Sequence, residues 1–273
     1  MGKGLMRLIT VGAALAVAAV SANGSVGSII SSFKFYAYYP PEATEAIHRD
    51  ASHVYILMWD YGGNKFIKGY LPNGTQSGGG FLGGWPPGGD PLPYDIDNTV
   101  LGAGYVGVVD NNGFLWIHTT SGSLVSSGKP IRSLRAFAYL PGGRYYYAPL
   151  YSPPGTVRRY TTTWSLLGSF SASAGDYIAA TDQFDGRVGE FIIAGLYNAV
   201  SVYTPRGSLV STFAVSTKAQ NYSCGPGYPA YWGTTLWYYY KHTPEYGYVY
   251  QVDLGASTTV TPTSLGKVKA LFR

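Results

Sequence analysis

The sequence predicts an all-β fold made of repeated units of four short strands, and three observations lead to that class. The 273 residues include 37 Gly, 17 Pro and 26 Tyr, and only 12% of them are charged. Coiled coils and helical bundles need abundant Ala, Glu, Lys and Leu, so this composition excludes them. Short apolar runs separated by turn-forming Gly, Pro and Asn indicate strands instead. The third observation is a segment that recurs along the chain at a nearly constant spacing.

The recurring segment has the form Gly-Ser-Leu-Val-Ser, and its anchoring serines Ser123, Ser165 and Ser208 are 42 and 43 residues apart. A period of about 40–45 residues built from short strands is typical of the blades of a β-propeller. With the weaker copies, six segments enclose five intervals, so we expect five four-stranded blades, with six as the alternative. The segments occupy residues 27–33, 80–84, 122–127, 165–170, 207–213 and 257–260.

Turn signals divide each period into strands. Residues 105–109 and 114–119 are expected to form a hairpin, because the intervening Asp-Asn-Asn-Gly ends in Asn-Gly, the strongest short turn signal. The two units that follow each contain four short apolar runs without helical periodicity. Their expected strands are residues 134–139, 144–148, 156–162 and 166–170 in the first unit, and residues 177–181, 190–196, 200–204 and 209–213 in the second.

One terminal strand is left over by this count, either residues 29–35 or the tail 265–273. In the first interpretation, this strand completes the blade begun at the other end of the chain and closes the ring. In the second, it adds to a sheet edge of a neighbouring molecule, which is a known mode of assembly.

The amino-terminal residues 1–22 have the pattern of an export signal or of a retained hydrophobic leader. Lys3 and Arg7 are followed by the apolar run 8–20 and then by small residues suited to a signal peptidase. Residues 23–273 are then expected to form a single propeller domain, secreted to the extracellular space or the cell surface. The apolar run is shorter than the roughly 18 residues of a bilayer-spanning helix, so we expect no membrane span in the mature chain.

The charge balance argues against nucleic acid as a partner. Removal of residues 1–22 removes two positive charges and no acids, so the formal net charge falls from +5 to about +3. No cluster of Lys and Arg remains to follow a phosphate backbone. Cys224 is the only cysteine, so it is either a small buried side chain or a free or intermolecular thiol.

Metal-binding and nucleophile patterns are weak in this sequence. The histidines lack the spacing of a zinc site, and neither a Gly-x-Ser-x-Gly elbow nor a phosphate-binding loop occurs, so no cofactor is expected. Residues 182–190 place three carboxylates around a Gly-containing turn, which suggests calcium, but they lack the alternating oxygen ligands of an EF-hand. The four histidines are His48, His53, His118 and His242.

Acidic residues near expected inner strands raise the question of a glycosidase. Such an enzyme needs two carboxyl groups about 5–10 Å apart, one protonated and one ionised. The competing role of these acids is to accept hydrogen bonds from turn amides, and we therefore name no catalytic residue. The candidates are Asp95, Asp97, Asp176 and Glu190.

Aromatic side chains are the more informative feature. Residues 145–147 are three consecutive tyrosines, and residues 237–240 are Trp-Tyr-Tyr-Tyr. Neighbouring side chains of a strand point to opposite faces, so these rings cannot all lie in one core. Packing between blades, stacking on sugars and burial by another subunit are the alternatives, since Tyr and Trp are enriched at interfaces.

Low charge favours subunits that cover one another, because a soluble monomer is expected to have a charged surface. The candidate assembly surface includes the Gly/Pro-rich residues 78–93 and a set of large apolar side chains. This set is Ile29, Ile30, Phe33, Phe35, Trp85, Tyr146, Tyr239, Leu271 and Phe272.

The repeat resembles that of secreted bacterial β-propeller repeat proteins, whose units contain a Gly-Ser-Leu-Val-Ser-Ser-Phe-like strand. The matching residues are 27–33, 122–127 and 207–213, and the closing segment 265–273 is similar to the ends of such proteins. Some propellers of this kind polymerise into tubular surface filaments. The resemblance therefore implies a propeller fold and a surface role, and it transfers no site residue because the shared motif is structural.

Together these observations predict a structural subunit of an extracellular or cell-surface filament, with copies of itself as partners. The alternative is a secreted lectin that binds glycans in repeated pockets between blades. A five-bladed glycoside hydrolase is the third hypothesis, and an enzyme is not the expectation.

Overall fold

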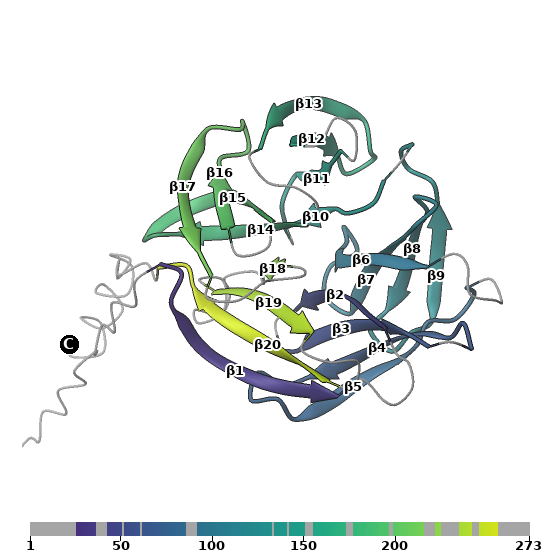
Figure 1. Cartoon of the computed structure of the whole chain (residues 1–273). Helices are drawn as coiled ribbons and strands as arrows, with labels where there is room; N and C mark the ends of the chain where they lie inside the picture. The colour runs from purple at the N-terminus through teal and green to yellow at the C-terminus, as the bar shows by residue number, and fades with distance from the viewer. Residues whose placement is uncertain are drawn as a thin grey trace, which may run out of the picture.

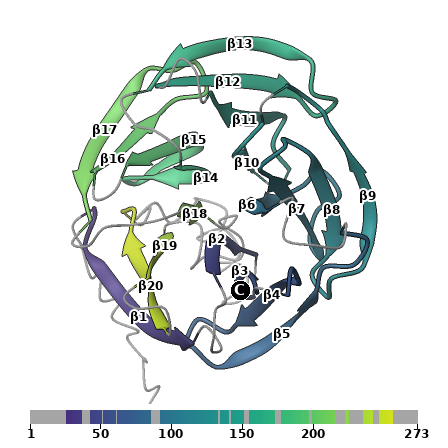
Figure 2. The same cartoon turned by 45° about the vertical axis from the view of Figure 1, so that its right-hand side comes forward.

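The computed structural model describes an all-β protein in which four-stranded sheets surround a central axis (Figures 1 and 2). The described part of the chain contains strands and turns but no helix, and hence no helix that could span a membrane. The described residues are 26–36, 43–50, 52–60, 62–85, 92–132, 134–140, 142–150, 155–172, 177–196, 199–215, 222–224, 235–241 and 246–255.

These residues form five sheets of four strands each. In chain order, the first sheet contains β2 (Ala43–Arg49), β3 (Val54–Trp59), β4 (Lys65–Tyr70) and β5 (Gln76–Phe81). The second contains β6 (Pro93–Asn98), β7 (Tyr105–Asp110), β8 (Leu115–Thr119) and β9 (Leu124–Gly128). The third contains β10 (Ala138–Tyr139), β11 (Tyr145–Pro149), β12 (Thr156–Thr161) and β13 (Leu166–Ser171). The fourth contains β14 (Tyr177–Phe184), β15 (Arg187–Leu196), β16 (Ala199–Tyr203) and β17 (Leu209–Ala214). The last contains β18 (Tyr222–Cys224), β19 (Thr235–Lys241), β20 (Tyr246–Asp253) and β1 (Ile29–Tyr36).

The first strand of each sheet lies nearest the axis. Strand β2 contacts β6, β6 contacts β10, β10 contacts β14, β14 contacts β18, and β18 contacts β2. This circuit of inner strands is visible around the centre of Figure 2. The propeller-like arrangement of four-stranded sheets is therefore confirmed.

The two ends of the chain meet in one sheet. Strand β1 pairs antiparallel with β20 from Ile29 opposite Val252 to Tyr36 opposite Tyr246. The amino-terminal strand thus completes the sheet formed by the carboxy-terminal strands, which is the first of the two expected roles for the surplus strand. The other expected segment, 265–273, lies outside the described residues, as does the leader 1–22.

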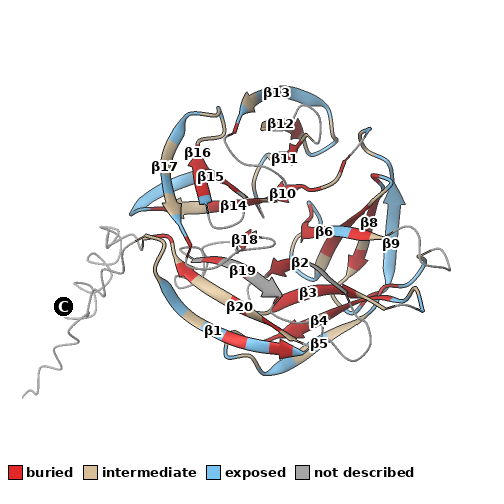
Figure 3. Ribbon diagram, viewed as in Figure 1, coloured by how far each residue is buried: buried red, intermediate tan, exposed pale blue. Residues whose placement is uncertain are grey.

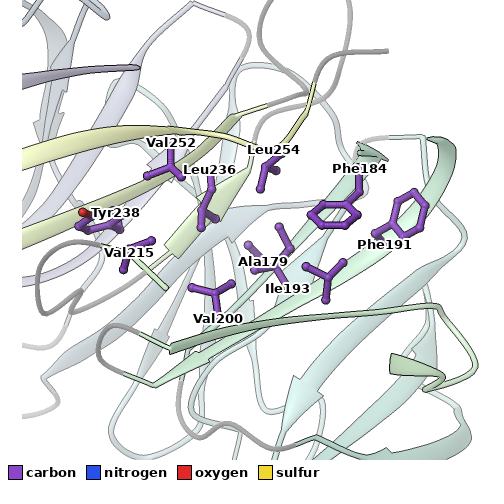
Figure 4. Close-up of a cluster of buried hydrophobic side chains, with 11 residues drawn as sticks. Ala179, Phe184, Phe191, Ile193, Val200, Val215, Leu236, Tyr238, Val252 and Leu254 are labelled. Carbon is purple, nitrogen blue, oxygen red and sulfur yellow. The ribbon is translucent and has the colours of Figure 1, made fainter. Parts of the chain in front are cut away.

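Apolar side chains fill the spaces between neighbouring sheets. Between the fourth and last sheets, Ile193 and Val200 pack in the same cluster as Leu236 and Val252 (Figure 4). Burial decreases from the inner strands to the outer ones, which Figure 3 shows as a change from red to pale blue. Each sheet is therefore stabilised mainly by burial of apolar surface against its neighbours.

A contact between glycine and phenylalanine recurs where neighbouring sheets meet at the periphery. Gly207, in the turn before β17, lies so close to Phe170 of β13 that an added Cβ would be 2.1 Å from the Phe170 Cβ. An added Cβ at Gly74, before β5, would likewise be 2.6 Å from the Phe33 Cβ. The phenylalanine ring then contacts a tyrosine of the next sheet, with centroids 5.6 Å apart for Phe170 and Tyr203.

The contact between the second and third sheets differs from this pattern, because both the phenylalanine and the glycine are replaced. Gly128 occupies the position that Phe170 has in β13, and Trp164 occupies the turn position that Gly207 has. Trp164 adopts a φ of +64°, a conformation rare for non-glycine residues. Its ring lies 5.7 Å from that of Tyr160, the counterpart of Tyr203. The ring that covers this tyrosine is thus supplied by the turn and not by the preceding outer strand.

The close approach at Gly207 predicts the effect of Gly207→Ala. Alanine at a φ of +88° costs about 1–2 kcal/mol, and the clash with Phe170 adds about 1–3 kcal/mol of overpacking. Gly142→Ala is the control, since its φ is +78° but an added Cβ meets nothing within 4 Å. Urea unfolding should show a larger loss for Gly207→Ala, and equal losses for the two variants would contradict the packing role.

Candidate functional site

The outer strand of each sheet presents a free edge in the described part of the chain. Strands β1, β5, β9, β13 and β17 each lie at the end of their sheet. Their sequences contain no proline and a single charged residue, Lys34. Natural monomers usually protect such edges with charge, proline or a covering segment, because free N–H and C=O groups can pair with another strand.

A pair of adjacent apolar residues begins four of these outer strands. In β13, Leu166 is 56% exposed and Leu167 is 46% exposed. Leu166 is opposite Tyr160, whereas Gly168 is opposite Arg159, so Leu167 is the extra residue of a β-bulge. Because a bulge interrupts the alternation of faces, two neighbouring apolar side chains can be exposed together. The four pairs are Ile29 with Ile30, Leu124 with Val125, Leu166 with Leu167, and Leu209 with the half-buried Val210.

Threonine fixes the turn before three of the pairs. The Thr161 Oγ1 accepts a hydrogen bond from the Ser165 backbone N–H at 3.0 Å. Thr119 makes the same bond to Ser123 at 3.0 Å. The recurring Thr, followed four residues later by Ser, therefore sets where each outer strand starts and where its bulge falls. The remaining example is Thr204 with Ser208, at 3.1 Å.

The expected assembly residues of β1 divide between the surface and the core. Ile29 and Ile30 are exposed, as expected for an assembly surface. Phe33 and Phe35 are not on the surface: they are 7% and 1% exposed and belong to a core cluster with Ile47. The correction follows from strand geometry, because alternate residues of β1 face the neighbouring sheet.

Tyr146 is another residue expected on the assembly surface, but it lies in the core. It is 1% exposed, and its ring stacks on Trp164 with centroids 4.3 Å apart. Its hydroxyl accepts a hydrogen bond from the Val100 N–H at 3.1 Å, which satisfies its polar end. Trp85 is half-buried and stacks on Trp116 at 4.8 Å. The Tyr239 side chain, Leu271 and Phe272 lie outside the described residues.

The acids considered for a glycosidase connect neighbouring sheets. Asp95 accepts a hydrogen bond from the Phe137 N–H at 2.9 Å, and Asp97 accepts one from the Tyr139 N–H at 3.2 Å. Both lie on β6 and bind backbone amides at or next to β10, and burial raises the pKa of the Asp97 carboxyl. These interactions are structural, because they satisfy buried amides of the adjacent sheet.

Glu190 lies on β15, in a different sheet from Asp95 and Asp97. Burial raises the pKa of its carboxyl, while the nearby Tyr147 hydroxyl and Arg159 guanidinium oppose that rise. Asp176 lies outside the described residues.

The segment considered for calcium forms the hairpin between β14 and β15. Asp185 and Gly186 have φ values of +48° and +71°, as in a two-residue type I′ turn. Phe184 is opposite Arg187 in the register that this turn closes. The carboxylates are therefore arranged by a turn, and the described residues contain no group of three or more His, Cys, Asp or Glu suited to a metal ion.

A groove that sequence analysis did not identify runs along β5. Its volume is about 320 Å³, near the lower end of typical ligand pockets. The signal in the sequence is the run of three glycines, residues 78–80, at the start of the Gly/Pro-rich segment. In the structure these glycines belong to the outer strand β5 and place no side chains over β4. Phe81, at the end of the groove, is 71% exposed. The lining residues are Asp60, Phe66, Ile67, Lys68, Gln76, Gly78, Gly79, Gly80 and Phe81.

The described histidines have buried or turn-forming roles. His48 is fully buried, with its Nδ1 3.4 Å from an Asp97 carboxylate oxygen. His53 lies 2.8 Å from the Ser52 hydroxyl. The Nε2–H of His118 donates to the Gly83 carbonyl at 3.0 Å, from the second sheet to the first. His242 lies outside the described residues.

His118 predicts a specific loss of stability in acid. Burial lowers its pKa below the ordinary 6.5, so below that pH the unfolded chain binds a proton that the folded chain resists. We expect the free energy of unfolding to decrease from about pH 8 to about pH 5, and to decrease less in His118→Gln, which retains a donor for Gly83. Urea unfolding at both pH values measures this difference, and an identical decrease in both proteins would contradict the prediction.

Comparison with known proteins provides no family. No family model and no curated protein matches the chain. Two solved structures of BBS1N in complex with ARL6DN, soaked with mercury or lead, are 16% identical, with TM-scores of 0.41 and 0.42. The matches cover 80% and 81% of this chain but only 66% and 64% of those chains, so it spans slightly less than two thirds of their length. A protein of unknown function from Bacteroides caccae is 11% identical, with a TM-score of 0.44, 72% of this chain covered and 70% of that chain.

Proposed function

We propose that this protein is a self-assembling structural subunit of an extracellular or cell-surface filament, and that its five sheets are the five blades of one closed propeller. Its partners are copies of itself. The observation that carries the proposal is the set of free outer edges, which contain one charged residue and repeat a bulged apolar pair on four sheets. The pattern in residues 1–22 supports export, because it matches a secretory signal.

Burial of the apolar pairs supplies a driving force for association. Removing apolar surface from water contributes about 25 cal/mol per Å², and several pairs face outward around one ring. The low content of charged residues, 12% of the chain, also limits repulsion between copies. Both features are unfavourable for a free monomer and favourable for a subunit whose periphery is covered.

The terminal strand offers a second route to the same assembly. Strand β1 is an outer strand whose partner in its sheet is β20. The same antiparallel pairing could form between two molecules, with β1 of one copy completing the last sheet of the next. An exchanged β1 would preserve the burial of Phe33 and Phe35 while joining the copies.

The apolar pairs provide the test of self-assembly. A variant with one lysine at each pair should remain monomeric at concentrations at which the unmodified protein polymerises, since each tenfold rise in the onset concentration corresponds to about 1.4 kcal/mol. We expect the onset to rise at least about tenfold, measured by light scattering and electron microscopy of the secreted protein. The substitutions are Ile30→Lys, Val125→Lys, Leu167→Lys and Leu209→Lys.

A control variant with the same added charge separates the apolar pairs from a general effect of charge. It replaces four exposed polar residues and should polymerise nearly as the unmodified protein does. Equal inhibition by both variants would contradict the role of the pairs. Unmodified protein that stays a monodisperse monomer at high concentration would overturn the proposed function and make glycan binding the next hypothesis. The control substitutions, all outside the outer strands, are Ser52→Lys, Asn73→Lys, Asn112→Lys and Thr162→Lys.

A further inference from the structure

The hairpin between β14 and β15 ends in an exposed tip of unusual composition. Residues 185–189 are all exposed, and Val188 is 76% exposed, the highest value among the large apolar side chains of the described chain. Asp185 and Arg187 place opposite charges beside it. Figure 3 shows this hairpin end in pale blue at the margin of the ring.

Backbone hydrogen bonds hold the tip in one position. The Asp185 N–H donates to the Leu254 carbonyl at 2.7 Å, and the Gly186 N–H donates to the Gly255 carbonyl at 3.3 Å. The tip is thereby attached to the end of β20 in the adjacent sheet. A protrusion that is already ordered loses little conformational entropy when it binds.

The groove along β5 has features complementary to this tip. Phe66 of β4 and the exposed Phe81 of β5 line the groove with ring centroids 5.7 Å apart, and the glycines of β5 contribute no side chains beside them. An aliphatic side chain could fill that apolar space. Asp60 and Lys68 place opposite charges along the same groove, so it can face both Arg187 and Asp185 with opposite charge.

The positions of tip and groove suit head-to-tail contact. The tip belongs to the fourth sheet and the groove to the first, and the last sheet lies between them in the ring. One molecule can therefore offer its tip to a second copy while its groove accepts the tip of a third. Contacts between two different surfaces are heterologous, and they generate open filaments when the rotation does not close.

We infer that the β14–β15 tip of one copy docks in the β5 groove of the next, with Val188 against Phe66 and Phe81, Arg187 facing Asp60, and Asp185 facing Lys68. This inference rests on the proposed function and names the surfaces that assembly uses. The occupant of the groove is thus a second copy of this chain.

Charge reversal on either side tests the contact. Arg187→Glu would place a carboxylate against Asp60, and Asp60→Lys would place an ammonium against Arg187. Each variant alone should therefore assemble only above an onset concentration at least about tenfold higher than that of the unmodified protein. Arg144→Glu is the matched control, because Arg144 is also exposed in a hairpin turn, between β10 and β11 and away from the apolar pairs, and its reversal should leave assembly unchanged.

Mixing the two variants gives the decisive result. In an alternating chain, the carboxylate introduced by Arg187→Glu meets the ammonium introduced by Asp60→Lys, and at the next contact the unmodified Arg187 meets the unmodified Asp60. An equimolar mixture should therefore assemble near the unmodified onset concentration, although neither variant does so alone. Melting temperatures of the separate variants verify that both fold, which matters because Asp60 accepts hydrogen bonds from Asn64 in its own turn.

The outcomes separate this inference from the proposed function. Restored assembly in the mixture supports the contact. If both single variants assemble normally while the lysine variant of the apolar pairs does not, the tip and groove are overturned and self-assembly stands. Two folded variants whose mixture stays unassembled also overturn the contact. Unmodified protein that never assembles overturns the proposed function itself, and binding of a glycan array that Phe81→Ala abolishes would then assign the groove to saccharides.

Discussion

The pairing of β1 with β20 is the interaction on which the rest of the structure depends. It brings the amino-terminal strand to the carboxy-terminal sheet and gives that sheet its fourth strand, next to the contact of β18 with β2 that closes the circuit of inner strands. It also places Phe33 and Phe35 in the apolar cluster between the last and first sheets. Without this strand, that cluster would lose one of its walls, and the apolar surface of two sheets would face water.

Polar side chains near the axis complement this closure. Asp95 and Asp97 of β6 accept backbone hydrogen bonds from residues at or next to β10. Farther from the axis, His118 of β8 donates to the Gly83 carbonyl, which follows β5. A buried backbone amide without a partner costs free energy comparable to a lost hydrogen bond, so the two aspartates stabilise the contact between β6 and β10 by accepting from the Phe137 and Tyr139 amides. Acids that look catalytic in the sequence can thus be required by the fold alone.

The repeat made most of the strands predictable. It did not predict which side chains of each strand pack against the neighbouring sheet. The turn before β8 and the four-strand units follow from Asn-Gly and from the Ser-Leu-Val segment, because local turn chemistry is visible in the sequence. The burial of Tyr146 depends on Trp164 and Val100, which only the packed sheets bring together. The β5 groove was not predicted, because it forms where the three glycines of β5 have no side chains.

Local turn chemistry also explains why the exposure of some candidate assembly residues, but not of others, could be predicted from the sequence. The apolar pair Ile29 and Ile30 falls at the bulge that begins an outer strand, so its exposure follows from the repeated segment. Phe33 and Phe35 lie on the same strand, but their burial depends on residues of the first sheet, which are distant from them in the repeat.

Gly128 and Trp164 reverse the usual arrangement, in which the outer strand supplies an aromatic ring and the next turn supplies a glycine. The second and third sheets therefore fit each other at this contact better than they fit other sheets. The third, fourth and last sheets each place a phenylalanine against a glycine of the next turn, whereas the second sheet has a glycine at this position and the third sheet supplies the tryptophan. A copy of the third sheet placed after the third, fourth or last sheet would bring two rings to one space, and a sheet with a glycine in this turn placed after the second sheet would bring none. Duplication, deletion or reordering of these sheets would therefore destabilise the packing between the second and third sheets, even though the sheets have similar backbones.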